Sequence, residues 1–341
     1  MRTMLSAVLC GALLELMAVP AGAAEQALID AAKKEGKVVW YTSLVVDQVV
    51  RPIAKGFEKK YGVKVDFVNS PWQEQAFRII QEGTAGVTKA DVFDALPSFA
   101  AINAAGMVAP YKPESAADYD PMYKSPEGLW TAHIIQPVSP AVNTDMVKPE
   151  NYPKTYEDLL DPMWKGKMAW TTSPSAGGPP GFIGTVLHAM GEEKGMAYLK
   201  KLAEQKIANI PSNQRVVLDR AVSGENPLVL SIYNYHVPIS QKKGAPVKWI
   251  KMEPMTAHVG VVALVKNSPH PNAGKLLIDY ILSDEGEQIQ ADAGYIPASP
   301  HVKAKAEGIK PGESYKIYLV TPEVFKENID RWVKIYEDLF E

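Results

Sequence analysis

The chain has 341 residues, of which 46% are hydrophobic and 22% charged, and its formal net charge at pH 7 is −3. This composition is typical of a globular protein long enough for two domains, and it lacks the basic excess that a nucleic-acid-binding face requires. The six histidines include no i, i+4 pair, and the single cysteine is Cys10, so the residue spacing of a zinc site is absent.

The N-terminal residues have the pattern of an export signal. Arg2 precedes a mostly apolar stretch at 4–19, and the small residues Ala-Gly-Ala follow at 21–23. This order predicts a secretory signal peptide over residues 1–23. Cys10 lies inside it, so the mature chain would have no thiol for catalysis, disulfides or iron–sulfur clusters. We therefore expect a protein of the bacterial periplasm.

Beyond the predicted signal peptide, strand and helix patterns alternate. Strands are expected within Gly36–Leu44, Val63–Ser70 and Ala90–Leu96, and a helical pattern follows each of them. The helix after the first strand is expected to end at Gly62. A β-α-β-α-β-α order at short intervals predicts a parallel sheet covered by helices.

The same alternation restarts in the second half of the chain. A helix is expected from Thr155, with Asp158 at the spacing of a capping box. The strand KMAWTT at 167–172, three helical patterns and the strand PLVLSIYNY at 227–235 follow in that order. This second series predicts a second α/β unit.

Two extended segments, 131–147 and 256–271, separate the two series, and the last third of the chain is helical. Two α/β lobes joined by two extended crossings account for this order most economically. The first lobe would comprise residues 24–136 and 259–341, and the second lobe residues 137–258. The C-terminal helices would be free to contact both lobes.

Several stretches together resemble a known family. They include VVWYTSL at 38–44, YPKTYEDLLDPMWKGKMAW at 152–170 and VGVVALVKNSPHPNAGKLLIDYILSDEGEQIQADAGYIPASP at 259–300. In their order and spacing, the chain resembles the periplasmic solute-binding proteins of bacterial ABC importers, in the branch grouped with ferric-ion-binding proteins. The resemblance implies a two-lobe, type II-like periplasmic-binding-protein fold. Its lobes would close on a ligand by a hinge and then dock on a permease in the inner membrane.

The sequence gives no sign of an enzyme. It contains no G-x-S-x-G or H-E-x-x-H motif, and no acid/base pair that the expected fold would bring together. We therefore expect a monomeric binding protein whose partners are a small solute and the permease, with no nucleic acid and no cofactor.

Ligands of open α/β sheets bind outside the carboxyl ends of the strands, so polar residues that follow the predicted strands are candidate ligand-binding residues. In the first lobe, hydroxyl, phenol, indole and carboxylate groups occupy such positions. These candidates are Tyr41, Thr42, Ser43, Trp72, Glu74 and Ser98.

In the second lobe, the stretch SPSAGGPPGF at 173–182 stands between a predicted strand and a predicted helix. Its glycines let the backbone approach a ligand, and the N-terminus of the following helix offers N–H groups and a positive dipole end. The stretch therefore predicts an anion cradle, although an ordinary Pro/Gly loop has the same composition. The candidate residues are Ser173, Ser175, Ala176, Gly177 and Gly178.

The stretch SIYNYHV at 231–237 bears on the identity of the ligand. The ferric-binding branch has adjacent tyrosines here, whose phenolates hold the ion, whereas Asn234 separates Tyr233 from Tyr235 in this chain. In an extended segment, residues i and i+2 share a face, so both phenols would still reach a cleft.

Two classes of ligand stay open. One is a small organic anion, such as a phosphonate, a phosphorylated compound or a carboxylate, with its charge on the predicted cradle. The other is a ferric ion held by the phenolates of Tyr233 and Tyr235, with a partner anion on the cradle. The separated tyrosines and the indole of Trp72 favour the organic anion.

Overall fold

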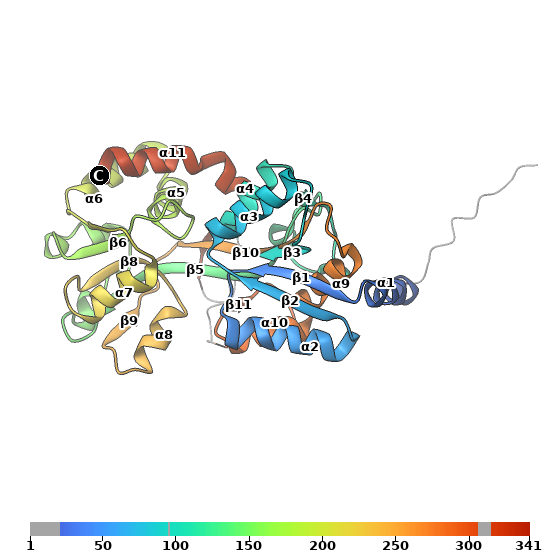
Figure 1. The fold of residues 1–341 in the computed structure, drawn as a ribbon. Coiled ribbons are helices and arrows are strands. Elements are labelled where there is room, and N and C mark those ends of the chain that lie inside the picture. Colours follow the sequence, from blue (N-terminus) through green and yellow to red (C-terminus); the bar gives the residue numbers. More distant parts are fainter. Residues whose placement is uncertain (1–20, 95, 306–314) are drawn as a thin grey trace, which may run out of the picture.

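The computed structural model describes residues 21–94, 96–305 and 315–341 (Figure 1). Residues 1–20 of the predicted signal peptide lie outside these ranges, and the described part begins with helix α1 (Ala21–Glu35). Within the described residues, no helix combines the length and the apolar character needed to cross a membrane.

Strands and helices alternate along the chain, and the two predicted α/β series are confirmed. The strands are β1 (Lys37–Thr42), β2 (Lys64–Asn69), β3 (Val92–Asp94), β4 (Val108–Ala109), β5 (Thr131–Asn143), β6 (Met168–Thr171), β7 (Ala208–Ile210), β8 (Leu228–Tyr233), β9 (Val247–Trp249), β10 (Met255–Val265), β11 (Ile296–Pro297) and β12 (Ile317–Val320). The further α-helices are α2 (Arg51–Tyr61), α3 (Trp72–Thr84), α4 (Leu96–Ala104), α5 (Pro179–Met190), α6 (Glu192–Ala203), α7 (Gln214–Val222), α8 (His236–Gln241), α9 (Pro271–Leu282), α10 (Asp284–Asp292) and α11 (Pro322–Phe340).

The strands join in the order β2-β1-β3-β10-β5-β8-β6-β7. Strand β1 is parallel to β2 and β3, and β6 is parallel to β7 and β8. The long strands β5 and β10 are antiparallel to each other and connect the two parallel groups. The result is the predicted α/β fold with two lobes and two extended crossings (Figure 1).

The two parallel groups run toward each other. Strand β3 is antiparallel to β10, and β10 is antiparallel to β5, so β3 and β5 share one direction. Strand β8 is antiparallel to the second half of β5 and therefore runs the opposite way. The carboxyl ends of β3 and β8 consequently both point to the middle of β5, which is where ligands of α/β sheets are expected.

The predicted lobe boundaries fall at the centre of the two crossings. There Gln136 of β5 pairs with His258 of β10. The exact division of the chain into lobes at these residues stays a prediction.

The cores of both lobes are built around large aromatic side chains. Trp40, Trp130, Trp164 and Trp170 are all buried, as the sequence predicts for packing rather than ligand-binding tryptophans. The C-terminal helix α11 contacts α4 in the first lobe and α5 and α6 in the second, so it spans both (Figure 1).

One predicted element differs from the structure. The helix expected from Thr155 is a pair of short 3₁₀ turns, Glu157–Leu160 and Pro162–Trp164. The predicted capping pair itself forms, because Thr155 Oγ1 accepts the N–H of Asp158 while the Asp158 carboxylate accepts the N–H of Thr155. Pro162 has no N–H to continue the first turn, which explains why an α-helix does not propagate.

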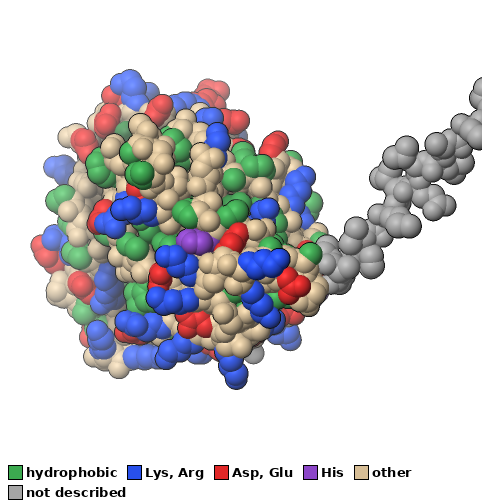
Figure 2. All heavy atoms as spheres, turned by 45° about the vertical axis from the view of Figure 1, so that its right-hand side comes forward, with side chains coloured by type: hydrophobic (Ala, Val, Ile, Leu, Met, Phe, Trp, Pro, Cys, Tyr) green, Lys and Arg blue, Asp and Glu red, His purple; other side chains and the backbone are tan. Residues whose placement is uncertain are grey.

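Acidic and basic side chains are interspersed on the face shown in Figure 2 rather than gathered into a basic stripe. This distribution agrees with the slightly negative net charge. It does not have the electrostatic footprint of a nucleic-acid-binding surface.

The contact between α5 and α11 gives a prediction on stability. A Cβ on Gly184 would lie 2.4 Å from Cζ2 of the buried Trp332 ring, so Gly184→Ala should lower the free energy of unfolding by about 1–3 kcal/mol. The urea midpoint at an unchanged m-value measures this loss.

The matched control is Gly83→Ala in α3, where the new Cβ would meet the flexible end of Met107. That side chain can move aside, so the gain in helix propensity, up to about 1 kcal/mol, should leave this variant as stable as the parent or more so. Equal midpoints for the two variants would contradict the packing argument.

Candidate functional site

A cavity of about 570 Å³ opens where the carboxyl ends of the two strand groups meet. This volume lies within the range of small-molecule sites. The cavity is lined by the turns after β1 and β6, the starts of α3 and α7, the ends of β3 and β8, and the middle of β5 and β10. The lining residues are Ser43, Leu44, Pro71, Trp72, Gln73, Asp94, His133, Ile134, Gln136, Thr172, Ser173, Pro174, Ser175, Ala176, Gly177, Ser212, Asn213, Gln214, Tyr233, Tyr235, His258, Gly260 and Tyr295.

The turn Ser173–Gly178 forms one wall of the cavity. The N–H of Ser175 donates to the carbonyl of Ser173 at 2.8 Å, and the N–H of Gly178 donates to the carbonyl of Ser175 at 3.0 Å. The N–H groups of Ala176 and Gly177 donate to no group among the described residues. The turn therefore offers backbone donors to a ligand.

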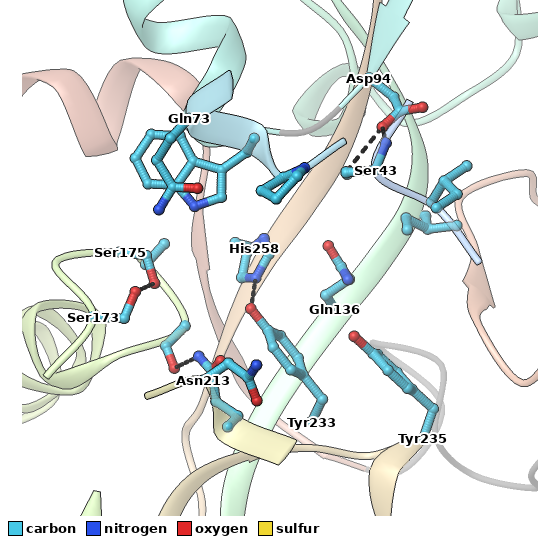
Figure 3. A pocket seen from close by; sticks show the side chains of 18 of the residues that line it. Ser43, Gln73, Asp94, Gln136, Ser173, Ser175, Asn213, Tyr233, Tyr235 and His258 are labelled. Carbon is cyan, nitrogen blue, oxygen red and sulfur yellow. Dashed lines mark hydrogen bonds between the residues drawn. The ribbon is translucent and has the colours of Figure 1, made fainter. Parts of the chain in front are cut away.

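Helix α5 adds positive potential to this wall. It begins immediately after Gly178, and no side chain caps its N-terminus. Pro179 and Pro180 occupy its first positions, where an N–H would have no partner within the helix. The positive end of the helix dipole lies behind the turn. The hydroxyls of Ser173 and Ser175, 3.2 Å apart, lie at the same wall (Figure 3).

Gly177 makes the closest approach between this turn and the rest of the site. A Cβ there would lie 2.3 Å from the hydroxyl oxygen of Tyr233 and 3.3 Å from Nε2 of Gln214. Gln214 in turn donates from Nε2 to the carbonyl of Gly177 at 2.9 Å. Only glycine fits between these two side chains, which fixes the turn against the end of β8.

Tyr233 and Tyr235 stand side by side in the cavity wall. Their rings stack with centroids 5.4 Å apart and an interplanar angle of 13°. The segment is not extended at this point, because β8 ends at Tyr233 and Tyr235 has helical dihedral angles at the start of α8. The turn at Asn234 nevertheless brings both phenols to the same cavity (Figure 3).

The phenol of Tyr233 is held by a neutral histidine. Its oxygen lies 3.0 Å from Nε2 of His258 (Figure 3). Burial lowers the pKa of His258 to about 4, so the ring is uncharged at neutral pH. Burial also raises the pKa values of Tyr233 and Tyr235, so both are protonated phenols at neutral pH.

Asp94 is the single carboxylate among the lining residues, and none of them is a lysine or an arginine. Its Oδ1 accepts from the N–H and the hydroxyl of Ser43 at 3.0 and 3.1 Å, and its Oδ2 accepts from Nε1 of Trp40 at 3.0 Å. Burial raises the pKa of Asp94 to about 6, since these neutral donors offset only part of the lost hydration.

Eight of the predicted ligand-binding residues line this cavity. They are Ser43, Trp72, Ser173, Ser175, Ala176, Gly177, Tyr233 and Tyr235. The structure thus brings the polar turns of both lobes together, as expected for carboxyl-side loops. Whether each residue contacts a ligand stays a prediction.

Two predicted residues of the first lobe point to other partners. The phenol of Tyr41 donates to Glu82 of α3 at 2.7 Å and does not line the cavity. Glu74 is exposed and pairs with Arg78, 2.8 Å away, one turn further along the same helix. Alternation along β1 and the helical position of Glu74 turn both side chains away from the cavity.

Three further predicted residues support the walls without lining them. Thr42 Oγ1 accepts the N–H of Leu44, and Ser98 donates to the carbonyl of Trp72. Gly178 caps α5, and a Cβ there would lie 2.2 Å from the carbonyl oxygen of Ser173. These residues hold the turns in shape.

Sequence reasoning missed several lining residues. The crossings carry the same tripeptide, Thr-Ala-His, at 131–133 and 256–258, and both histidines line the cavity. Gln136, which pairs with His258 across the two strands, lines it as well. Polar side chains within otherwise apolar extended segments were the signal that could have revealed them.

A two-lobe α/β fold with a polar cavity between the carboxyl ends of both strand groups is the architecture expected of a solute-binding protein. The chain belongs to the family described as bacterial extracellular solute-binding protein, whose sequence model matches residues 88–318. Members of this family are extracellular or periplasmic, and they are transport proteins rather than enzymes. At the level of the family, this confirms the expected location outside the cytoplasmic membrane and the expectation of a binding protein rather than an enzyme. The chain is accordingly a solute-binding component of an ABC transporter.

Two relatives agree with this assignment. The chain is 25% identical to the Fe(3+)-binding periplasmic protein of Serratia marcescens over 71% of this chain and 73% of the relative. It is 22% identical to a putative 2-aminoethylphosphonate-binding periplasmic protein of Salmonella typhimurium, over 82% and 86% of the two chains.

Two solved structures have the same fold. Iron-bound HitA from Pseudomonas aeruginosa superposes with a TM-score of 0.74 at 23% identity, over 89% of this chain and 99% of that one. AfuA from Actinobacillus pleuropneumoniae, with fructose-6-phosphate bound, superposes with a TM-score of 0.70 at 22% identity, over 89% and 98%. Both likenesses concern the fold, and the named ligands differ in chemistry.

The raised pKa of Asp94 predicts a specific pH dependence. The folded protein holds the proton up to about pH 6, whereas the unfolded chain releases it near 3.8, so the stability of the parent should fall as the pH rises through this window. Relative to Asp94→Asn, the fall between pH 4 and pH 7 should amount to about 2 kcal/mol at ~1.4 kcal/mol per pH unit, because the unfolded carboxyl is already partly ionised at pH 4.

Urea unfolding of both proteins at pH 4 and pH 7 measures this change. The histidines that titrate near pH 4 are common to the two proteins, so their contribution cancels in the difference. A difference in stability that stays constant between the two pH values would contradict the burial argument for Asp94.

Proposed function

We propose that this protein captures a small organic anion, namely a phosphonate, a phosphorylated compound or a carboxylate, between its two lobes. It would deliver this solute to an ABC importer permease. The observation that carries the proposal is the turn Ser173–Gly177, with unpaired backbone N–H groups and two serine hydroxyls in a cavity of about 570 Å³.

Neutral donors at this wall suit an anion. The N–H groups of Ala176 and Gly177 donate to no described group, and the positive end of α5 stands behind them. Hydrogen bonds from neutral donors to a charged acceptor are stronger than those between neutral groups, and they strengthen further when closure excludes water. No lysine or arginine among the lining residues competes for the charge.

The rest of the cavity suits an organic framework. Leu44, Pro71, Trp72 and Ile134 add apolar surface to the lining. Small-molecule sites combine such surface with a few placed polar groups. A single ion would leave most of this space and surface unused.

A ferric ion is the second candidate, because Tyr233 and Tyr235 line the cavity side by side. Against it, burial raises the pKa of both phenols, so each proton would have to be displaced at a cost. Asp94 is the one carboxylate in the lining, and the described residues contain no group of three His, Cys, Asp or Glu side chains able to hold a metal.

The route to the periplasm and the transport cycle belong to the same proposal. The predicted signal peptide at 1–23 would direct export, and the mature protein would act as a periplasmic monomer. The crossings β5 and β10 would form the hinge about which the lobes close on the solute and present it to the permease.

A thermal-shift screen tests the proposal, with alkylphosphonates, sugar phosphates and small carboxylates run beside ferric citrate. A matching anion at ~100-fold excess over Kd should add ~2.7 kcal/mol of stability and leave the protein colourless. A visible phenolate-to-iron absorption band with ferric citrate, abolished by Tyr233→Phe combined with Tyr235→Phe, would instead establish the ferric candidate.

Gly177→Ala should weaken anion binding by more than tenfold. Its Cβ would overlap the hydroxyl of Tyr233 and push the turn out of position, so the backbone donors would move away from the anion. Calorimetric titration with the best anion of the screen measures the affinity, with Gly83→Ala, remote from the cavity, as the control. Unchanged affinity in Gly177→Ala would show that the turn does not hold the anion.

A further inference from the structure

The cavity is chemically asymmetric. One wall presents hydrogen-bond donors: the hydroxyl of Ser175, which accepts from that of Ser173, and the N–H groups of Ala176 and Gly177. Asp94 and Ser43 lie at the opposite end (Figure 3). There the Asp94 carboxylate is an acceptor, and the hydroxyl of Ser43 is already directed to it at 3.1 Å.

Asp94 is a buried carboxylate without a cationic partner. Among the described residues, its donors are neutral groups of Ser43, Thr42 and Trp40, and no lysine or arginine lines the cavity. Hydrogen bonds from neutral donors reduce the cost of burying the charge but leave the charge itself in place. The carboxylate therefore gives this end of the cavity a negative potential.

His133 adds a second acceptor without a partner. Its side chain is buried, and its Nδ1 pairs with the amide oxygen of Gln290, whose Nε2 is used by two backbone carbonyls. Nδ1 is thereby assigned as the protonated nitrogen, so Nε2 is a bare acceptor, and it has no partner among the described residues. Gly260 lies beside it, where a Cβ would approach Nε2 to 3.3 Å.

Aromatic surface also contributes to the cavity. Tyr295 lies close enough to Asp94 to be affected by its charge, and Trp72 lines the same cavity. Aromatic faces attract cations through the ring quadrupole, with tryptophan the strongest of the side chains. The carboxylate of Asp94, the bare nitrogen of His133 and the aromatic rings all favour a positively charged nitrogen. They disfavour a second anionic group.

We propose that the solute is zwitterionic: besides the anionic group held by the turn Ser173–Gly177, it carries a protonated amine that Asp94 receives. This inference rests on the proposed function and narrows its ligand class. Asp94 is then a specificity-determining residue that separates aminated from non-aminated anions. His133 lines the same cavity, and its bare Nε2 is a further acceptor for an N–H of the solute.

The test uses matched pairs of probes that differ only in the amine, titrated calorimetrically at pH 7.5. The pairs are 2-aminoethylphosphonate with ethylphosphonate, and β-alanine with propionate. In the parent, the aminated member of the binding pair should bind at least tenfold more tightly. In Asp94→Asn, which keeps the size of the side chain, this preference should fall below about threefold while the non-aminated probe keeps its affinity.

Ser175→Ala is the matched control at the other end of the cavity. It removes a donor to the anion, so it should weaken both members of a pair by the same factor. If Asp94 acted only by holding the turn at Ser43, Asp94→Asn would also weaken both members equally, and that result would overturn the inference.

A measurement on the parent protein alone covers the case in which Asp94→Asn does not fold. The preference for the aminated probe should decline as the pH falls through about 6, where Asp94 takes up a proton. The lining histidines His133 and His258 titrate near pH 4, and Tyr295 near 12, so they do not titrate in this range. The ammonium lowers the second pKa of the phosphonate, so the two phosphonates do not ionise together near pH 6. The pH series therefore uses β-alanine and propionate, whose carboxylates both stay ionised across this range.

Three results are decisive. A tenfold preference that depends on Asp94 supports the inference. Equal affinities within each pair, with binding intact, overturn it and leave the proposed function standing. If none of the four probes binds and ferric citrate binds instead, the proposed function and this inference are both overturned.

Discussion

The pairing of β5 with β10 is the constraint on which the site depends. These two antiparallel strands run through both lobes. The parallel strands of one lobe pair with one half of them, and those of the other lobe pair with the other half. Because the two groups then run toward each other, their carboxyl ends face one gap. Every lining turn, from Ser43 in one lobe to Ser173–Gly177 in the other, owes its position to this arrangement.

Under the proposed function, selectivity follows from neutral donors at one end of that gap and a lone carboxylate at the other. Gly177 lets the backbone lie against Tyr233, and neutral N–H and hydroxyl groups replace the charged side chains that many anion sites use. Neutral donors allow release as well as capture, since the anionic group of the solute has no ion pair with the turn that must break when the lobes open. A protein that hands its solute to a permease benefits from such a balance.

The order of elements, the two crossings and the turn at 173–178 were predictable from the sequence, because local periodicity and glycine placement determine them. Tyr41 and Glu74 were misplaced because the direction of a side chain at a strand end or on a helix depends on packing with α3. Asp94 and His133 were missed because their place in the cavity depends on β3 and β5 lying in the same sheet. The sequence also does not show that no lysine or arginine lines the cavity beside them. Pattern alone carries no such long-range information.

The central claim is that the backbone of the turn Ser173–Gly177 holds the negative charge of the solute. Amide resonances of ¹⁵N-labelled protein, followed as 2-aminoethylphosphonate is added, examine those N–H groups one by one. The account predicts that Ala176 and Gly177 show the largest downfield shifts and slowed hydrogen exchange, as expected for N–H groups that gain a charged acceptor. Saturable binding that leaves both resonances unchanged would contradict it.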